Sequence, residues 1–159
     1  MTNKVTLDFF FNREDDWGAN YNSTENKFYL KFSYATRNSQ RSLIVHEAIH
    51  AACDNSDFNH MLTNTSEAFA YIGQCIFMLT KLPAGSERNL GNEEDTARDL
   101  VFARAWACAE VIIGGGQPNH QQVELLRSAI LSHPYYTDSG TQNAGYDGIP
   151  FSFRRLIGV

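Results

Sequence analysis

The spacing of hydrophobic residues changes from a two-residue period to a helical period about 35 residues into the chain. Residues 27–35 (KFYLKFSYA) alternate, with Phe28, Leu30 and Phe32 on one side. Residues 4–11 (KVTLDFFF) are also rich in β-branched and aromatic residues. Both patterns are typical of strands. We therefore predict a small antiparallel sheet at the N-terminus, with a polar, turn-rich connection between the two strands.

The rest of the chain predicts about four helices and a tail. Thr65 or Ser66 is the expected N-cap of the second helix, and Pro83 lies just beyond its end. The tail from Pro134 onward is rich in glycine and aromatic residues and is expected to wrap around the body of the protein. No repeat or domain boundary is visible, so we predict a single α+β domain over residues 1–159. The expected helices cover about residues 39–55, 66–81, 93–113 and 119–132.

Composition and charge narrow the choice of partners. A chain of 159 residues with 43% apolar and 13% aromatic residues suits one packed domain. The formal charge is −5 and no basic run occurs, which argues against nucleic acid or an anionic membrane as a partner. No apolar segment is long enough to cross a bilayer.

Cysteine usage bears on the cellular compartment. Cys53, Cys75 and Cys108 lie in apolar, helix-like surroundings and form no paired framework. We interpret them as reduced core thiols, which favours folding in a cytoplasm. The N-terminus lacks the length and the small-residue cleavage site of a secretory signal. We expect a protein that is cytoplasmic as synthesised, and export by a route without a cleaved signal stays open.

The first predicted helix carries the motif His46-Glu47-Ala48-Ile49-His50. Residues four apart are about 40° apart in projection, so His46 and His50 can aim both imidazoles at one point and hold a zinc ion. Glu47 is rotated by about 100° from His46, where its carboxylate could accept a proton from a metal-activated water that attacks a carbonyl. The surrounding helix is apolar, and unpartnered polar side chains are costly to bury there. We favour a metal site over three core residues that satisfy one another.

A catalytic zinc site usually has three protein ligands. The leading candidate for the third is Glu67, which opens the second helix among small residues that permit close helix approach. Alternatively, Glu67 only interacts with the helix dipole. His60 and Asp57 are further candidates in the intervening loop. Cys53 is interpreted as core, because one ion could hardly reach it and both histidines.

Other residues could support such a site. Tyr71 shares a helix face with Glu67 and could orient a ligand or stabilise an oxyanion, although a buried tyrosine bonded to a backbone carbonyl explains it equally well. His133, Tyr135 or Tyr136 could supply a transition-state donor from the C-terminal half.

The segments LIVHEAIHAACD and TSEAFAYIGQCIF together resemble the core of small zincin-like metallopeptidases of the gluzincin type. They are also similar to metallopeptidase domains of bacterial toxins and effectors. The resemblance covers about residues 27–80. It implies that His46, His50 and Glu67 bind Zn²⁺ and that Glu47 is the general base. It also implies an edge strand, for which residues 27–35 are suitably placed, that pairs with an extended peptide substrate.

These observations lead to one main hypothesis and two alternatives. The main hypothesis is a zinc-dependent metallopeptidase that acts on a peptide or protein. The first alternative is a bacterial effector or toxin domain of the same fold, which would have an immunity or carrier protein as a partner. The second is a non-enzymatic helical binding module that holds no metal.

Overall fold

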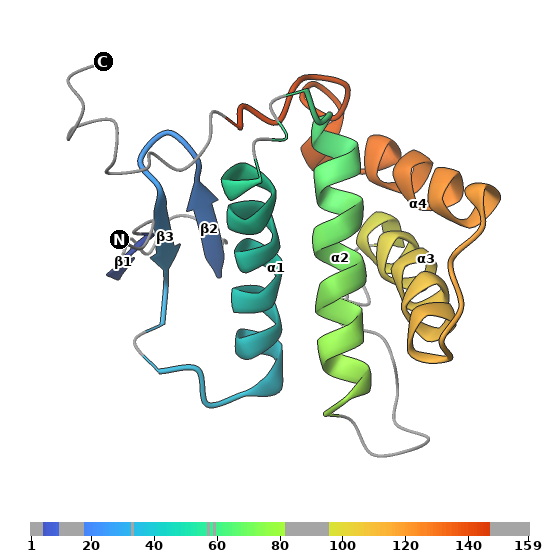
Figure 1. Ribbon diagram of the computed structural model, residues 1–159, viewed down its shortest axis with the longest axis horizontal. Helices are drawn as coiled ribbons and strands as arrows, with labels where there is room; N and C mark the ends of the chain where they lie inside the picture. The colour runs from blue at the N-terminus through green and yellow to red at the C-terminus, as the bar shows by residue number, and fades with distance from the viewer. Residues whose placement is uncertain are drawn as a thin grey trace.

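The fold consists of a small sheet followed by four helices, so the predicted α+β class is confirmed. In Figure 1 the sheet lies on one side of α1, and α2, α3 and α4 lie on the other. The structure, a computed structural model, describes residues 5–9, 18–32, 34–56, 58, 60–81 and 96–146. Its elements are β1 (Thr6–Phe9), β2 (Ala19–Asn22), β3 (Lys27–Leu30), α1 (Asn38–Asn55), α2 (Thr63–Leu79), α3 (Thr96–Ile113), α4 (His120–Ser132) and the 3-10 helix η1 (Pro134–Tyr136).

The sheet has the order β1-β3-β2. Strands β2 and β3 are antiparallel, whereas β1 runs parallel to β3. The sheet thus contains an antiparallel pair, but the two strands that the sequence predicted, in residues 4–11 and 27–35, are parallel to each other. Strand β2 (ANYN) lies in the segment that the sequence pattern assigned to a turn-rich connection, so that assignment was wrong. Only two of its four residues are apolar. Its strand conformation depends on pairing with β3, which the pattern of residues within β2 does not reveal. A turn at residues 23–26 joins β2 to β3, and Asn26 has a φ of 54° there, a region that asparagine tolerates better than most residues.

Polar and apolar residues are buried on opposite sides of α2. Most of the buried residues of α1 are polar, and they include His46, Glu47 and His50. The hydrophobic core is instead formed by α2, α3, α4 and η1. Helix α2 therefore separates a polar layer from an apolar one. Among the largest fully buried side chains of the apolar core are Leu126, Ile130, Val101, Cys75 and Cys108.

Helix α2 begins earlier than the sequence indicated. Its N-cap is Leu62, which makes no side-chain capping bond, so the predicted cap at Thr65 or Ser66 was wrong. The backbone carbonyls of Gln142 and Gly140 accept hydrogen bonds from the first two amides of the helix instead. An orphan amide at a helix start needs a partner, and here that partner comes from about 80 residues away in the chain. The tail does return to the body of the protein as far as residue 146; residues 147–159 lie outside the described part.

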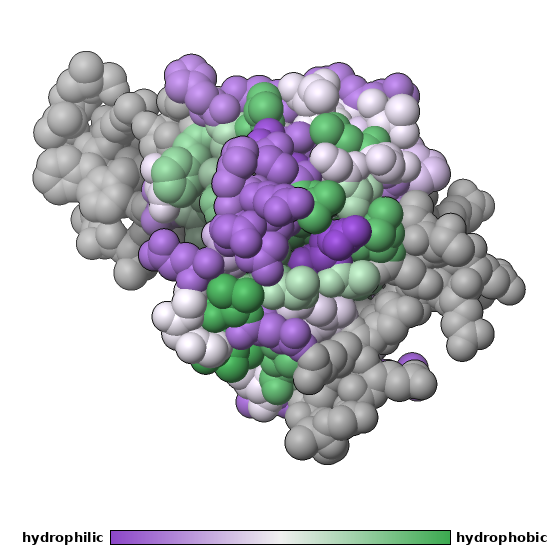
Figure 2. All heavy atoms as spheres, turned by 90° about the vertical axis from the view of Figure 1, so that its right-hand side faces the viewer, coloured by the Kyte–Doolittle hydropathy of each residue, from purple (hydrophilic) through white to green (hydrophobic). Residues whose placement is uncertain are grey.

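Cys53, Cys75 and Cys108 are buried and unpaired, as predicted. None of the described helices combines the length and the apolar character needed to cross a membrane. Where Figure 2 shows described atoms, hydrophilic and hydrophobic residues are interspersed over the surface, with no single large apolar patch.

The close approach of α1 and α2 depends on Gly73. A Cβ atom at this position would lie 2.0 Å from Cδ1 of Ile49. We predict that Gly73→Ala lowers the free energy of unfolding, because overpacking costs about 1–3 kcal/mol and removal of a helical glycine recovers about 0.5–1 kcal/mol. In an Ile49→Ala background the same change should be neutral or stabilising. Urea unfolding of the four proteins measures this coupling, and a coupling energy below about 0.5 kcal/mol would contradict it.

Candidate metal centre

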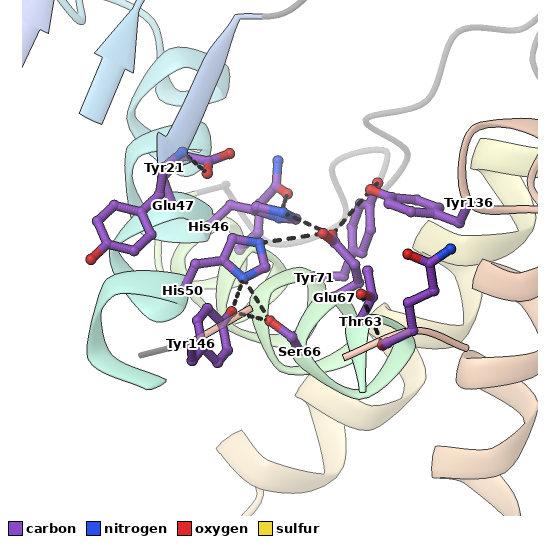
Figure 3. Close-up of polar contacts among 12 residues, drawn as sticks. Tyr21, His46, Glu47, His50, Thr63, Ser66, Glu67, Tyr71, Tyr136 and Tyr146 are labelled. Atoms are coloured by element: carbon purple, nitrogen blue, oxygen red, sulfur yellow. Dashed lines mark hydrogen bonds and ion pairs between the residues drawn. The ribbon is translucent and has the colours of Figure 1, made fainter. Parts of the chain in front are cut away.

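Helices α1 and α2 bring His46, His50 and Glu67 to one point. Nε2 of His46 lies 3.2 Å from Oε2 of Glu67, and Nε2 of His50 lies 3.5 Å from Oε1 of the same carboxylate. One ligand atom from each residue lies within 4.8 Å of the other two. Figure 3 shows both imidazoles directed at the Glu67 carboxylate from the neighbouring helix. The three residues form a group that could hold a metal ion.

The spacing of these atoms suits a tetrahedral metal site. With bonds of about 2.0–2.1 Å, ligand atoms of a tetrahedral zinc ion are about 3.3 Å apart. The separations of 3.2 and 3.5 Å between histidine nitrogens and carboxylate oxygens are of this size, although they end on different oxygens of Glu67. With one ligand atom taken from each residue, the three atoms lie within 4.8 Å of one another. Two imidazole nitrogens and one carboxylate are also a donor set that divalent transition metals accept. The residues therefore fit a metal ion in both geometry and chemistry.

A chain of hydrogen bonds orients His46. Its Nδ1 lies 3.1 Å from Oε1 of Gln74. The amide nitrogen of Gln74 donates to Oγ of Ser42 at 3.2 Å, and that hydroxyl donates to the carbonyl of Ser39 at 2.7 Å. Because Gln74 offers an acceptor, a proton on Nδ1 of His46 is satisfied there. Nε2 of His46 bonds to Glu67 in this structure, so it would bind a metal ion only in place of its proton.

His50 is held by two hydroxyl groups. Its Nδ1 lies 2.7 Å from Oγ of Ser66 and 2.8 Å from the hydroxyl of Tyr146. These two hydroxyls also bond to each other. Either oxygen can accept a proton from Nδ1, which leaves Nε2 of His50 facing Glu67. Sequence reasoning missed Tyr146 and the role of Ser66, because residue 146 lies 96 positions from His50 and belongs to no element with a regular period.

Tyrosines hold the Glu67 side of the site. The hydroxyl of Tyr136 donates to Oε2 of Glu67 at 3.0 Å and lies 3.3 Å from the hydroxyl of Tyr71. The Tyr71 ring packs edge-on against His46, with 4.8 Å between centroids. Tyr71 thus lines the site. Its hydroxyl is connected to the candidate ligand Glu67 through the hydroxyl of Tyr136.

Glu47 lies beside the three candidate ligands and is fixed by the sheet. Its side chain is buried, and Oε2 accepts a 2.7 Å hydrogen bond from the backbone amide of Tyr21 in β2. The hydroxyl of Tyr21 donates to Oδ2 of Asp54 at 2.7 Å. Tyr21 therefore joins β2 to α1 at two points about two helical turns apart. Tyr21 was not among the residues predicted from the sequence, because β2 was not predicted.

Burial and mutual charge change the pKa values of these groups. Burial raises the pKa of Glu47, and the charge of Glu67 adds to this effect. Burial lowers the pKa of His50 to about 4. Burial alone would raise the pKa of Glu67, but the hydrogen bond from His46 and the charges of both histidines lower it. Likewise, burial opposes protonation of His46, yet its bond to Glu67 and the nearby carboxylate charges raise its pKa. Glu67 is thus ionised and His50 neutral at neutral pH, as metal ligation requires. The raised pKa of His46 favours its protonated form, so a metal ion would have to displace a proton from this residue.

The site opens into a cleft of about 820 Å³ between the sheet, α1, α2 and the C-terminal segment. Its walls combine the two glutamates and the histidines with several aromatic rings. Among the residues that line it are Ala19, Asn20, Tyr21, Leu43, His46, Glu47, His50, Glu67, Tyr71, Phe102, His133, Tyr135, Tyr136 and Tyr146.

The other residues that the sequence suggested for the site lie outside the group of three candidate ligands. His60 is exposed and does not belong to the three-residue group. Asp57 lies outside the described residues. Cys53 is buried and unpaired and also stands outside the group, as predicted. His133 and Tyr135 line the cleft, so both stay candidates for contact with a bound substrate.

We predict that the protein binds one zinc ion through this group and is stabilised by it. Zinc at 100 times its Kd should raise the free energy of unfolding by about 2.7 kcal/mol, which corresponds to roughly 5–10 °C in Tm for a domain of this size. His46→Ala should abolish the shift, whereas His120→Ala, at an exposed position on α4, should leave it intact. Thermal unfolding of chelator-treated protein, with and without added zinc, measures this shift in Tm. An equal Tm in both samples, with no metal in the purified protein, would support the metal-free binding module.

Comparison of the chain with protein-family models, with curated proteins and with solved structures gives no match.

Proposed function

We propose that this chain is a zinc-dependent metallopeptidase. The observation that carries the proposal is the convergence of both histidines of the HExxH motif with Glu67, inside a cleft that Glu47 also lines. A zinc ion bound there would supply a Lewis acid and lower the pKa of a coordinated water to about 7. His46 and His50 would bind it through Nε2, and Glu67 through its carboxylate. The resemblance to gluzincin-type metallopeptidases supports the same assignment.

Glu47 is the general base in this proposal. The Tyr21 amide fixes Oε2, so we assign proton transfer to Oε1. A general base works best when its pKa lies close to the working pH, and burial raises the pKa of Glu47 in that direction. Glu47 would take a proton from the attacking water and pass it to the amine that leaves the cleaved peptide bond.

The substrate would be a peptide in extended conformation. The expected pairing with residues 27–35 is not available, because β3 is the central strand and is bonded on both sides. Strand β2 is an edge strand instead, and residues 19–21 line the cleft. A peptide laid along β2 would form backbone hydrogen bonds that tolerate many side chains, except with the amide of Tyr21, which is bonded to Glu47.

A metal-free binding module is the second candidate, and one observation favours it. In the described structure, Glu67 pairs with both histidines and the Tyr21 amide bonds to Glu47, so these buried polar groups satisfy one another. The zinc-dependent thermal shift separates the two candidates.

Glu47→Gln should abolish hydrolysis while zinc binding and folding persist. The amide oxygen of glutamine can still accept the Tyr21 hydrogen bond, but the side chain cannot accept a proton from water. We expect kcat/KM on an unstructured protein substrate to fall by at least about 10²-fold, with unchanged zinc stoichiometry. Glu124→Gln, a change in the partly exposed pair with Arg127, is the matched control. Cleavage by Glu47→Gln at the wild-type rate would refute the mechanism.

Tyr71→Phe tests whether this hydroxyl stabilises the oxyanion. The change keeps the edge-on packing against His46 and removes only the hydroxyl. Loss of one oxyanion donor lowers kcat by roughly 10²-fold, and we expect a fall of this size with little change in KM. Steady-state kinetics report both values. An unchanged kcat would leave Tyr71 with a packing role only.

A further inference from the structure

The segment after α4 returns to the candidate metal centre. We call residues 133–146 the C-terminal clasp. Its backbone joins the start of α2: the amide of Thr63 donates to the carbonyl of Gln142 at 2.8 Å, and the amide of Asn64 to that of Gly140 at 2.9 Å. The clasp therefore caps the helix that carries Glu67, one turn before this residue.

Two tyrosines of the clasp reach two different candidate ligands. Tyr136 donates to Oε2 of Glu67 at 3.0 Å. Tyr146 lies 2.8 Å from Nδ1 of His50 and also bonds to Ser66. Figure 3 shows them approaching the three candidate ligands from opposite sides. Both tyrosines are buried, with 7% and 6% of their surfaces exposed.

We propose that Tyr136 and Tyr146 are positioning residues of the metal centre and that docking of the C-terminal clasp sets its affinity for metal. This inference rests on the proposed zinc site. The Tyr136 hydroxyl holds the Glu67 carboxylate with both oxygens toward the histidines. The Tyr146 hydroxyl, with Ser66, holds the proton of His50 on Nδ1. Without these bonds, the side chains of Glu67 and His50 could rotate away from the metal position. The free-energy cost of fixing them again would weaken metal binding.

Both tyrosines could instead serve only to fill space, and Tyr→Phe substitutions separate the two roles. Phenylalanine keeps the buried ring and its packing but loses the hydroxyl. A packing role predicts unchanged metal affinity, whereas a positioning role predicts weaker binding in a protein that is still folded.

The test measures zinc affinity of the full chain by competition with a chromophoric chelator. Loss of a hydrogen bond to a metal ligand typically weakens metal binding by about 10–100-fold. We expect Tyr136→Phe and Tyr146→Phe each to weaken zinc binding by about 10-fold or more. Tyr34→Phe is the control, because Tyr34 is 80% exposed and should bind as the wild type does. Circular dichroism of the metal-free proteins establishes that each is folded. Cobalt(II) absorption gives a second readout, since altered ligand geometry changes its visible bands.

Gly140→Ala tests the docking step without a change in any residue that contacts the ligands. A Cβ there would lie 2.6 Å from Cδ2 of Leu131 and 2.9 Å from the carbonyl oxygen of Tyr136, so the clasp must shift. We expect weaker zinc binding in this variant as well. If Gly140→Ala does not fold, the two phenylalanine variants decide the question.

The outcomes separate this inference from the proposed function. If the wild type binds no zinc, or binds it equally well after His46→Ala, the proposed metal centre is wrong. If the wild type binds zinc through His46 but both phenylalanine variants bind within twofold of it, the metal centre stands and the clasp proposal is overturned.

Discussion

The structure depends on one arrangement of charge: the carboxylate of Glu67 on α2 lies between two imidazoles of α1. Such a group is costly to bury without partners. Here the partners come from α2, from η1 and from the C-terminal segment. Gln74 bonds to His46, Ser66 and Tyr146 bond to His50, and Tyr136 bonds to Glu67. The contact between α1 and α2 therefore combines this hydrogen-bonded polar group with the close packing of Ile49 against Gly73.

This polar contact is possible because the apolar core lies elsewhere. Helices α2, α3 and α4 bury a cluster of aliphatic, aromatic and cysteine side chains. Helix α2 belongs to both layers, so its position is fixed by the core while its other face carries Glu67. Figure 1 shows this arrangement, in which α1 and the sheet lie on one side of α2 and the remaining helices on the other. A rigid element that supports a functional residue in this way can hold it to the tolerance that metal ligation needs.

The sheet has a similar role for Glu47. Tyr21 of β2 connects the sheet to α1 through its bonds to Glu47 and Asp54. One edge-strand residue thus orients the proposed base, and the same strand lines the cleft where a substrate would lie. In the proposed mechanism, the position of the base and that of the substrate are consequently linked through β2.

The sequence by itself determined the α+β class, the four helices and the pairing of His46 with His50, because helical period and a four-residue spacing are local properties. It also singled out Glu67, which the structure brings to the histidines. Only the tertiary structure decided the rest. Strand β2, the early start of α2 and the contacts of Tyr136 and Tyr146 all depend on partners distant along the chain. A hydrogen bond between residues 50 and 146 leaves no periodic signal in the sequence, since nothing in the local pattern of residue 146 differs from that of any other tyrosine in a turn-rich tail.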